Sequence, residues 1–418
     1  MPAPAVPSLV LSFEDARHLV ERQAASVEPR GVETVDLLSA HGRVLAESVV
    51  TDRDIPPFPR STRDGFAVRS ADLPTLPARL RLIGEIKAGE RPENIPSIIN
   101  SGETASIMTG APVPPGTDAV VMVEYTSLDS NTVEIARAVS AGENVVPAGA
   151  EAKKGNTLIE KGARLDEARI ALAASAGSSL LLVYQRPQVA VLTTGDEIVD
   201  VEANPGPTQI RNSNSHSLAV QIVNAGGDPL VLPVAPDEPL RLRALIEEGL
   251  RSDLLLMTGG VSMGRYDLVE QVLSELNAEF FFTGAKIQPG RPVVFGKCHA
   301  NAHEETSTYF FGLPGNPIST MVTFEVFARP MIEAISGMSL RKLKFVYARL
   351  KSDIRVKTGL KRFLPAILSG EFEDTAVELV PWQGSGDIAA TARANCYIVI
   401  PTDREQIAAG EFVPVMIR

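Results

Sequence analysis

Short apolar runs alternate with helix-like segments over residues 187–336 of the chain. The apolar runs occupy residues 189–192, 230–234, 254–257 and 309–311, and they predict strands. Apolar residues recur every three or four positions in residues 214–224, 239–250, 268–277 and 317–333, and they predict helices. Strands that alternate with helices and are apolar on both faces are typical of a parallel sheet covered on both sides. The pattern predicts a doubly wound α/β domain, to which residues 280–282 and 293–295 add an antiparallel hairpin.

The first 186 residues follow a different pattern. Ser12, with Asp15 three positions later, predicts a capped helix over residues 13–21. Further helices are predicted near Gly42, where the helix is short, and over residues 165–176. Short β-like runs lie between them, at residues 80–83, 105–108, 119–123 and 133–136. We expect residues 152–186 to pack against residues 9–54, so that a β-rich domain is inserted into a helical one.

These changes of pattern divide the chain into four domains. Residues 9–54 and 152–186 form a helical linker domain, and residues 55–151 form the inserted β domain. Residues 187–336 form the central α/β domain. Short β runs after Gly337 predict a C-terminal β domain over residues 337–418. The predicted fold class is therefore α/β multidomain, with a doubly wound central domain.

The composition excludes several functional classes. The chain has 418 residues, of which 44% are hydrophobic and 22% charged, as in globular proteins. Its net charge of −11 argues against a nucleic-acid surface and an anionic membrane as partners. The chain has only 2 cysteines, no signal sequence, and no apolar run near the ~20 residues that span a bilayer. We expect a soluble cytoplasmic protein that binds neither nucleic acid nor membrane.

Three glycine turns follow strands of the predicted sheet. They read Leu-Thr-Thr-Gly-Asp-Glu at residues 192–197, Thr-Gly-Gly-Val-Ser-Met-Gly-Arg-Tyr-Asp at residues 258–267, and Gly-Leu-Pro-Gly-Asn-Pro at residues 312–317. The carboxyl ends of parallel strands share one edge of a sheet, and glycine turns before helices expose N–H groups to anions. None of the turns has the spacing of a P-loop or a dinucleotide fingerprint. They predict a site for a phosphate-bearing ligand.

Acidic side chains accompany these turns. Asp196 and Glu197 follow Gly195, and Asp237 and Asp267 are expected at the same edge of the sheet. Carboxylates beside an anion site repel the anion unless a cation lies between them. A hard divalent ion such as Mg²⁺ is therefore predicted, and the alternative is a solvated acidic loop.

Some of these residues also have a capping interpretation. Asp237, Asp267 and Asn316 each precede a predicted helix and suit its N-cap position. A cap does not require the adjacent glycines Gly259 and Gly260, which let a ligand approach the backbone closely.

Two loops of the inserted domain carry further polar residues. Asp64 lies in the proline-stiffened loop at residues 56–67, and Thr109 lies at a strand end in residues 107–112. Such loops are more ordered than a linker requires, although ordinary turn chemistry is the alternative.

Taken together, the motifs resemble those of the molybdopterin molybdenumtransferase family, which includes the gephyrin E-domain. The resemblance covers nearly the whole chain. It rests on PPFPRSTRDGFAVR (56–69), IMTGAPVPPGTDAVVMVE (107–124), VAVLTTGDEIV (189–199), QIRNSNS (209–215), TGGVSMGRYDLVE (258–270), QPGRPVVFG (288–296), LPGNPIST (313–320) and GSGDIAATARAN (384–395).

The resemblance implies a function. Enzymes of this family bind adenylylated molybdopterin and molybdate, insert molybdenum at the dithiolene and release AMP, with a divalent cation that is usually Mg²⁺. They are elongated homodimers of four-domain chains, whose active site lies between the central molybdopterin-binding domain and the N-terminal domains of the other subunit. The molybdopterin adenylyltransferase and molybdoenzyme apoproteins are further candidate partners.

The resemblance also implies roles for single residues. It implies that Asp64, Thr109, Glu197, Asp237 and Asp267 are catalytic, and that three of them, Glu197, Asp237 and Asp267, also bind the metal. The residues that it implies bind the substrates are Gly195, Asp196, Ser213, Gly259, Gly260, Ser262, Gly264, Lys286, Arg291, Pro314, Gly315, Asn316, Pro317 and Ser385.

The chain departs from the family pattern at two basic positions. Val146 stands in a segment where arginines are common, and Gly284 stands where a lysine is common. Lys286 is a candidate substitute, and Arg291 remains. Weaker affinity for molybdate, or use of another oxyanion such as tungstate, is a hypothesis that follows. Two rival functions stay open: a molybdopterin adenylyltransferase, which does not need residues 1–186, and a non-catalytic scaffold or ligand-binding paralogue.

Overall fold

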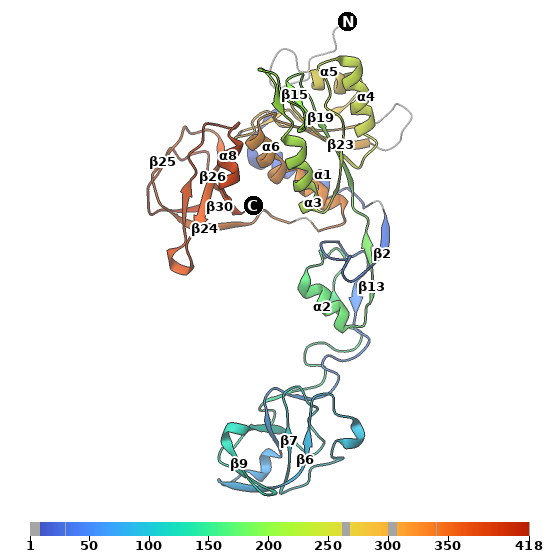
Figure 1. The fold of residues 1–418 in the computed structure, drawn as a ribbon, viewed down its shortest axis with the longest axis vertical. Coiled ribbons are helices and arrows are strands. Elements are labelled where there is room, and N and C mark those ends of the chain that lie inside the picture. Colours follow the sequence, from blue (N-terminus) through green and yellow to red (C-terminus); the bar gives the residue numbers. More distant parts are fainter. Residues whose placement is uncertain (1–8, 30, 261–267, 300–306, 340, 418) are drawn as a thin grey trace.

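The protein is an elongated molecule (Figure 1). The structure, a computed structural model, describes residues 9–29, 31–260, 268–299, 307–339 and 341–417. The inserted domain lies at one end and the linker domain in the middle, while the central and C-terminal domains lie side by side at the other end. Among the described residues, no helix is long and apolar enough to cross a membrane.

A six-stranded sheet forms the core of the central domain. Its spatial order is β17 (Asp228–Val231), β14 (Gln188–Thr193), β18 (Leu254–Thr258), β23 (Ser307–Leu313), β22 (Val294–His299) and β19 (Glu279–Phe282). The first four strands run parallel, and β22 and β19 are antiparallel to their neighbours. The sheet is therefore mixed, with the predicted parallel strands and the predicted antiparallel pair both present.

The direction of winding reverses between β14 and β18. From β14 the chain passes through α3 (Asn214–Ala225) to β17, and then through α4 (Pro239–Gly249) back across β14 to β18. On one face of the sheet the core includes α4 and α5 (Leu268–Glu275). On the other face it includes α3, α6 (Pro317–Thr323) and α7 (Arg329–Ile335). A ligand crevice is expected at such a reversal, outside the carboxyl ends of the strands.

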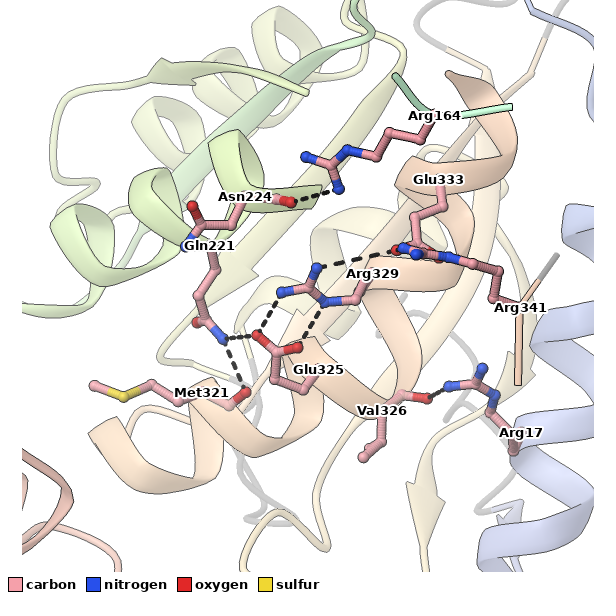
Figure 2. A network of polar contacts seen from close by, with 10 residues as sticks. All are labelled: Arg17, Arg164, Gln221, Asn224, Met321, Glu325, Val326, Arg329, Glu333 and Arg341. Atoms are coloured by element: carbon pink, nitrogen blue, oxygen red, sulfur yellow. Dashed lines mark hydrogen bonds and ion pairs between the residues drawn. The ribbon is translucent and has the colours of Figure 1, made fainter. Parts of the chain in front are cut away.

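The helix predicted over residues 317–333 is interrupted between α6 and α7. The connecting segment is a π-helical turn, η4 (Phe324–Ala328). Pro330 has no N–H with which to reach the carbonyl of Val326 four residues earlier. The Nη1 atom of Arg17 donates to that carbonyl instead, at 2.6 Å (Figure 2). The prediction of one regular helix is therefore wrong at its centre, because it neglects the missing donor of Pro330.

The N-terminal helix α1 (Phe13–Ala24) packs against the central domain. Ser12 caps it as predicted, and its Oγ atom accepts a hydrogen bond from the Asp15 backbone at 3.0 Å. The buried face consists of Phe13, Ala16, Val20 and Ala24. This face belongs to the core that contains α7 and η4, and burying its Phe and Val side chains stabilises the protein by roughly 1.5–3 kcal/mol each. In addition, β1 (Val10–Leu11) pairs with β20 (Gly284–Ala285).

Residues 9–24 thus pack with the central domain, whereas the sequence pattern groups them with residues 152–186. The physical reason is that an amphipathic helix shows which of its faces is buried but not which element covers that face.

The linker domain joins two distant segments of the chain. The strand β2 (Val32–Asp36) pairs with β13 (Leu180–Tyr184), and β3 (Val49–Val50) pairs with β12 (Thr157–Ile159). The helix α2 (Glu167–Ser175) packs beside β12. Residues 32–50 therefore meet residues 157–184, as expected.

The short helix predicted near Gly42 is wrong, because residues 37–42 form turns. The Asp36 carboxylate accepts hydrogen bonds from the backbone N–H groups of Leu38 and Ser39, both at 2.9 Å. An Asp side chain that bonds the backbone two residues ahead favours a turn over a helix.

The inserted domain contains a second six-stranded sheet. Its spatial order is β8 (Ala119–Met122), β5 (Gly65–Val68), β7 (Glu103–Ile107), β6 (Ala78–Ile86), β10 (Thr132–Ile135) and β9 (Thr126–Asp129). A short pair, β4 (Arg60–Ser61) with β11 (Val145–Val146), lies where the domain joins the linker domain. The β-rich prediction for this region is confirmed.

The C-terminal domain is a closed β-barrel. Its strands are β26 (Lys361–Ser369), β27 (Ala376–Leu379), β24 (Phe345–Leu350), β30 (Phe412–Ile417) and β28 (Cys396–Ile400), and β28 pairs back onto β26. A short strand, β21 (Ile287–Gln288), extends from the central domain and pairs with β26. The helix α8 (Ile388–Arg393) covers the barrel on the side of α6. The predicted C-terminal β domain is therefore confirmed.

Candidate active site

The three glycine turns meet at one cavity of about 370 Å³ at the carboxyl edge of the central sheet. The first turn contributes Glu197, and the turn after β18 contributes Gly259 and Gly260. The turn after β23 contributes residues 314–316. The cavity lies where the winding direction reverses, so the prediction that these turns converge is confirmed.

Two adjacent glycines shape the turn after β18. Gly259 has φ 88° and Gly260 has φ 62°, in the region that disfavours residues with a Cβ atom. A Cβ atom on Gly259 would lie 2.5 Å from the carbonyl oxygen of Thr194. Glycine at this position is therefore required for the first two turns to approach each other.

Asn214, the first residue of α3, connects the turns. Its Nδ2 atom donates to the Thr258 Oγ1 atom at 3.0 Å and to the carbonyl of Gly315 at 2.7 Å. The Thr258 hydroxyl donates in turn to the carbonyl of Pro314 at 3.1 Å. One buried amide therefore holds the end of β18 and the turn after β23 against the start of α3.

Thr194 and Asn214 line the cavity but are absent from the predicted site. Both are buried, and neither the Thr194 Oγ1 atom nor the Asn214 Oδ1 atom has a hydrogen-bond partner among the described residues. The amide orientation of Asn214 follows from its neighbours, because the carbonyl of Gly315 can only accept. A polar residue at the start of a helix that follows a glycine turn is the signal that could have indicated Asn214.

Three carboxylates lie beside the cavity, and none of them pairs with a described cationic side chain. Asp196, Glu197 and Asp237 are exposed, and the Asp237 backbone N–H donates to the Asp196 Oδ1 atom at 3.1 Å. Within the described part of the chain, none of the three forms an ion pair, and no three His, Cys, Asp or Glu side chains are grouped closely enough to hold a metal ion. Asp267, Ser262 and Gly264 lie outside the described residues.

The capping alternatives do not account for two of these residues. Asn316 occupies the N-cap position of α6, but its side chain makes no capping bond. Its Nδ2 atom donates to the Ser385 Oγ atom of the C-terminal domain at 3.0 Å, and the backbone N–H of Ile318 donates to the Ser385 carbonyl. Asp237 precedes the N-cap residue of α4, which is Glu238. The C-terminal domain therefore reaches the edge of the cavity through Ser385.

The remaining described residues that were predicted in the central domain do not line this cavity. Gly195 donates its N–H to the carbonyl of Ala235, Ser213 precedes α3, and Pro317 is the first residue of α6. Lys286 and Arg291 are exposed. Arg291 directly precedes Pro292, which lines the cavity.

Asp64 and Thr109 form a separate pair in the inserted domain. The Asp64 Oδ1 atom accepts hydrogen bonds from the Thr109 backbone at 2.7 Å and from its hydroxyl at 2.9 Å. These bonds, the backbone bond first, hold the pKa of the Asp64 carboxyl below its usual value. The inserted domain lies at the far end of the molecule from the central sheet (Figure 1), so one chain does not bring this pair to the cavity.

Comparisons with known proteins agree along the whole chain. Family models match for the MoeA N-terminal region (domains I and II) over residues 11–177, a probable molybdopterin binding domain over residues 190–334, and the MoeA C-terminal region (domain IV) over residues 347–417. A molybdopterin molybdenumtransferase of Nostoc sp. is 32% identical over 392 residues, which cover 92% of this chain and 88% of that protein. The chain belongs to the MoeA family. A MoeA family member from Synechococcus elongatus, also a molybdopterin molybdenumtransferase, is 32% identical over 98% of this chain and 100% of its own length.

Solved structures of MoeA proteins share the fold. A molybdopterin biosynthesis MoeA protein from Pyrococcus horikoshii matches 98% of this chain and 99% of its own, with a TM-score of 0.72 and 31% identity. A second structure of a MoeA protein from that organism matches with a TM-score of 0.79 and 26% identity. The four-part architecture is therefore that of the MoeA family.

Proposed function

We propose that the chain transfers molybdenum from molybdate to the dithiolene of adenylylated molybdopterin and releases AMP. The observation that carries this proposal is the single cavity formed by three glycine turns at the reversal of the central sheet, in a chain that matches molybdopterin molybdenumtransferases over nearly its full length. In the reaction, the phosphoanhydride bond between the molybdopterin phosphate and AMP is cleaved. Glycine turns at this edge suit the phosphates, because their N–H groups can donate hydrogen bonds to negatively charged oxygens.

The chemistry of the donors supports Mg²⁺ as the metal. Glu197 lines the cavity, Asp196 and Asp237 lie beside it, and none is neutralised by a described cationic side chain. Mg²⁺ is commonly held by one or two carboxylates together with substrate phosphates and water. Glu197 and Asp237, with Asp267, are the residues that would hold it. When bound, it neutralises charge that develops on the leaving phosphate.

We further propose that the enzyme acts as a homodimer. Asp64 and Thr109 lie far from the cavity of their own chain, so they can act on its ligand only from a second subunit. Mixing Asp64→Asn with Glu197→Gln protein tests this arrangement, because a mixed dimer keeps one intact site. Recovery of up to about a quarter of wild-type activity is expected from random pairing, whereas no recovery with demonstrated subunit exchange contradicts shared sites.

This chain differs from the family pattern in the basic residues available to bind the oxyanion. A Cβ atom on Gly284 would lie 3.1 Å from the Val10 Cγ2 atom of β1, so a lysine there would require the Val10 side chain to shift by a few tenths of an ångström. Lys286 and Arg291 are exposed, and Arg291 directly precedes Pro292 of the cavity lining. We propose weaker molybdate binding, or acceptance of tungstate; full activity at ordinary molybdate concentrations with no use of tungstate counts against it. A cytoplasmic location suits the two buried free cysteines.

The test of the proposed function is AMP release from adenylylated molybdopterin in the presence of Mg²⁺, with and without molybdate. Release that depends on molybdate is the expected result. Release without such dependence contradicts the proposal. Formation of adenylylated molybdopterin from ATP and molybdopterin would instead identify an adenylyltransferase, and absence of both reactions would identify a non-catalytic paralogue.

A further inference from the structure

A second cavity, which we call the basic cavity, lies between the linker domain and the segment that directly follows the central domain, from which Met338, Ser339, Arg341 and Lys344 line it. Its volume is about 700 Å³, within the range of small-molecule sites. It lies at the other end of α3 from the active-site cavity. Asn214 begins this helix at the glycine turns, and Asn224 lies near its end, so the two cavities are separated by roughly the 17 Å length of the helix.

The basic cavity carries an excess of positive charge. Five cationic side chains line it, namely Lys161, Arg164, Arg169, Arg341 and Lys344, against the two carboxylates of Glu160 and Asp166. This excess of three charges occurs in a chain whose net charge is −11. The charge is therefore a local feature of the cavity and not a property of the whole surface.

Ion pairs neutralise only part of this charge. Arg169 pairs with Asp166, and Arg341 pairs with the buried Glu333 at 2.5 Å. Within the described part of the chain, no carboxylate lies within ion-pair distance of Lys161, Arg164 or Lys344. Three cationic groups from two domains thus face one cavity without an anionic partner.

Hydrogen bonds to the linker domain and to the central domain hold Arg164 in position. Its Nε atom donates to the carbonyl of Gly42 in the linker domain at 3.2 Å, and its Nη1 atom donates to the carbonyl of Asn224 in the central domain at 3.1 Å (Figure 2). Its Nη2 atom has no acceptor among the described residues. Burial first, and then repulsion from Arg341, lowers the pKa of the Arg164 guanidinium. An anion in the cavity would offset the repulsion between Arg164 and Arg341.

We propose that the basic cavity binds a small phosphorylated molecule with at least two negative charges. Phosphoryl oxygens suit the guanidinium of Arg164 together with the two ammonium groups of Lys161 and Lys344, because each N–H donor can form a charge-assisted hydrogen bond with them. The site is independent of the glycine turns and uses no residue of the proposed reaction.

Pyrophosphate binding to the full-length chain, measured by isothermal titration calorimetry without a divalent cation, tests this site. In Lys161→Gln/Lys344→Gln protein, the affinity should fall at least about tenfold, since two charge-assisted contacts are lost. The matched control is Lys87→Gln/Lys351→Gln, which removes the same charge from pairs with Glu85 and Glu378 in other domains. The control should bind as the wild type does.

Equal pyrophosphate affinity in the wild type and in the Lys161→Gln/Lys344→Gln protein would overturn the proposal, as would equal losses in this protein and the control. A wild-type chain that binds no pyrophosphate at about millimolar concentration would overturn it too. Binding that strengthens in Glu197→Gln protein and is unchanged in the double variant would assign the anion to the glycine turns, where loss of a carboxylate removes repulsion, and would overturn the proposal as well. Molybdate-dependent AMP release should persist in the double variant. Loss of AMP release from the wild type would therefore contradict the proposed function, whereas the pyrophosphate titration tests the basic cavity alone.

Discussion

Replacement of Asn214 by alanine tests whether one amide holds the three turns together. The change removes two hydrogen bonds from the Nδ2 atom, to Thr258 Oγ1 and to the carbonyl of Gly315. At about 1 kcal/mol each, their loss costs about 2 kcal/mol. The change also removes the Oδ1 atom, a buried acceptor without a partner in the described part of the chain, and relief of this unsatisfied group returns about 1 kcal/mol. We therefore expect Asn214→Ala to lower the free energy of unfolding by only about 1 kcal/mol.

The loss of activity should be larger than the loss of stability. Without its amide tether the turn at residues 314–316 can shift, and a displacement of about 1 Å at a reacting centre can cost about 100-fold in rate. A 100-fold loss corresponds to about 2.7 kcal/mol, which exceeds the stability change. Calorimetric unfolding and kcat/KM for AMP release measure the two effects on the same protein.

The matched control is Asn224→Ala, near the other end of α3. The Asn224 side chain is exposed, and the contact with Arg164 uses its backbone carbonyl, which alanine keeps. This variant should stay within about 0.5 kcal/mol of the wild type and keep its activity. Wild-type kcat/KM in Asn214→Ala protein would refute the reasoning, and so would equal activity losses in the two variants.

Three further predictions concern single residues. Glu197→Gln should keep the fold, because Glu197 is exposed, and should raise the Mg²⁺ concentration for half-maximal activity at least about tenfold; an unchanged Mg²⁺ titration contradicts its role. The pKa of Asp64 is lowered by Thr109, so its stabilising contribution is present above the ordinary pKa of about 4 and is lost as the pH falls through the lower folded value. The Tm difference between wild type and Asp64→Asn should therefore stay constant from pH 8 to about 5 and shrink below about 4; a change near neutrality argues against the contact. Burial raises the pKa of Cys298 and of Cys396 to about 11, so neither thiol should react with Ellman's reagent at pH 8 until the protein unfolds, and rapid native labelling would contradict their burial.

Much of the central domain could be predicted because its strands are apolar on both faces. The runs at residues 189–192 and 254–257 correspond to β14 and β18, and the turns that follow them lie at the predicted edge. Local patterns of this kind depend on neighbours in the sequence. The glycine pair at residues 259–260 could also be recognised, because it directly follows the strand in the sequence.

Contacts between distant segments could not be predicted. The bond from Arg17 to the Val326 carbonyl joins residues 309 positions apart, and nothing near Arg17 in the sequence indicates it. The role of Asn214 depends likewise on Thr258 and Gly315, which come close only in the folded sheet. The position of Asp64 far from the cavity follows from the linker domain, whose length and direction no periodicity reveals.

The most direct test of the account is a single-turnover measurement of AMP release by wild-type and Glu197→Gln protein. With adenylylated molybdopterin, Mg²⁺ and molybdate, the wild type should release one AMP for each molybdopterin that gains molybdenum, and Glu197→Gln should release AMP far more slowly. Wild-type AMP release that is the same without molybdate, or an unchanged rate in Glu197→Gln protein, would contradict the assignment of molybdenum transfer to the cavity of the three glycine turns.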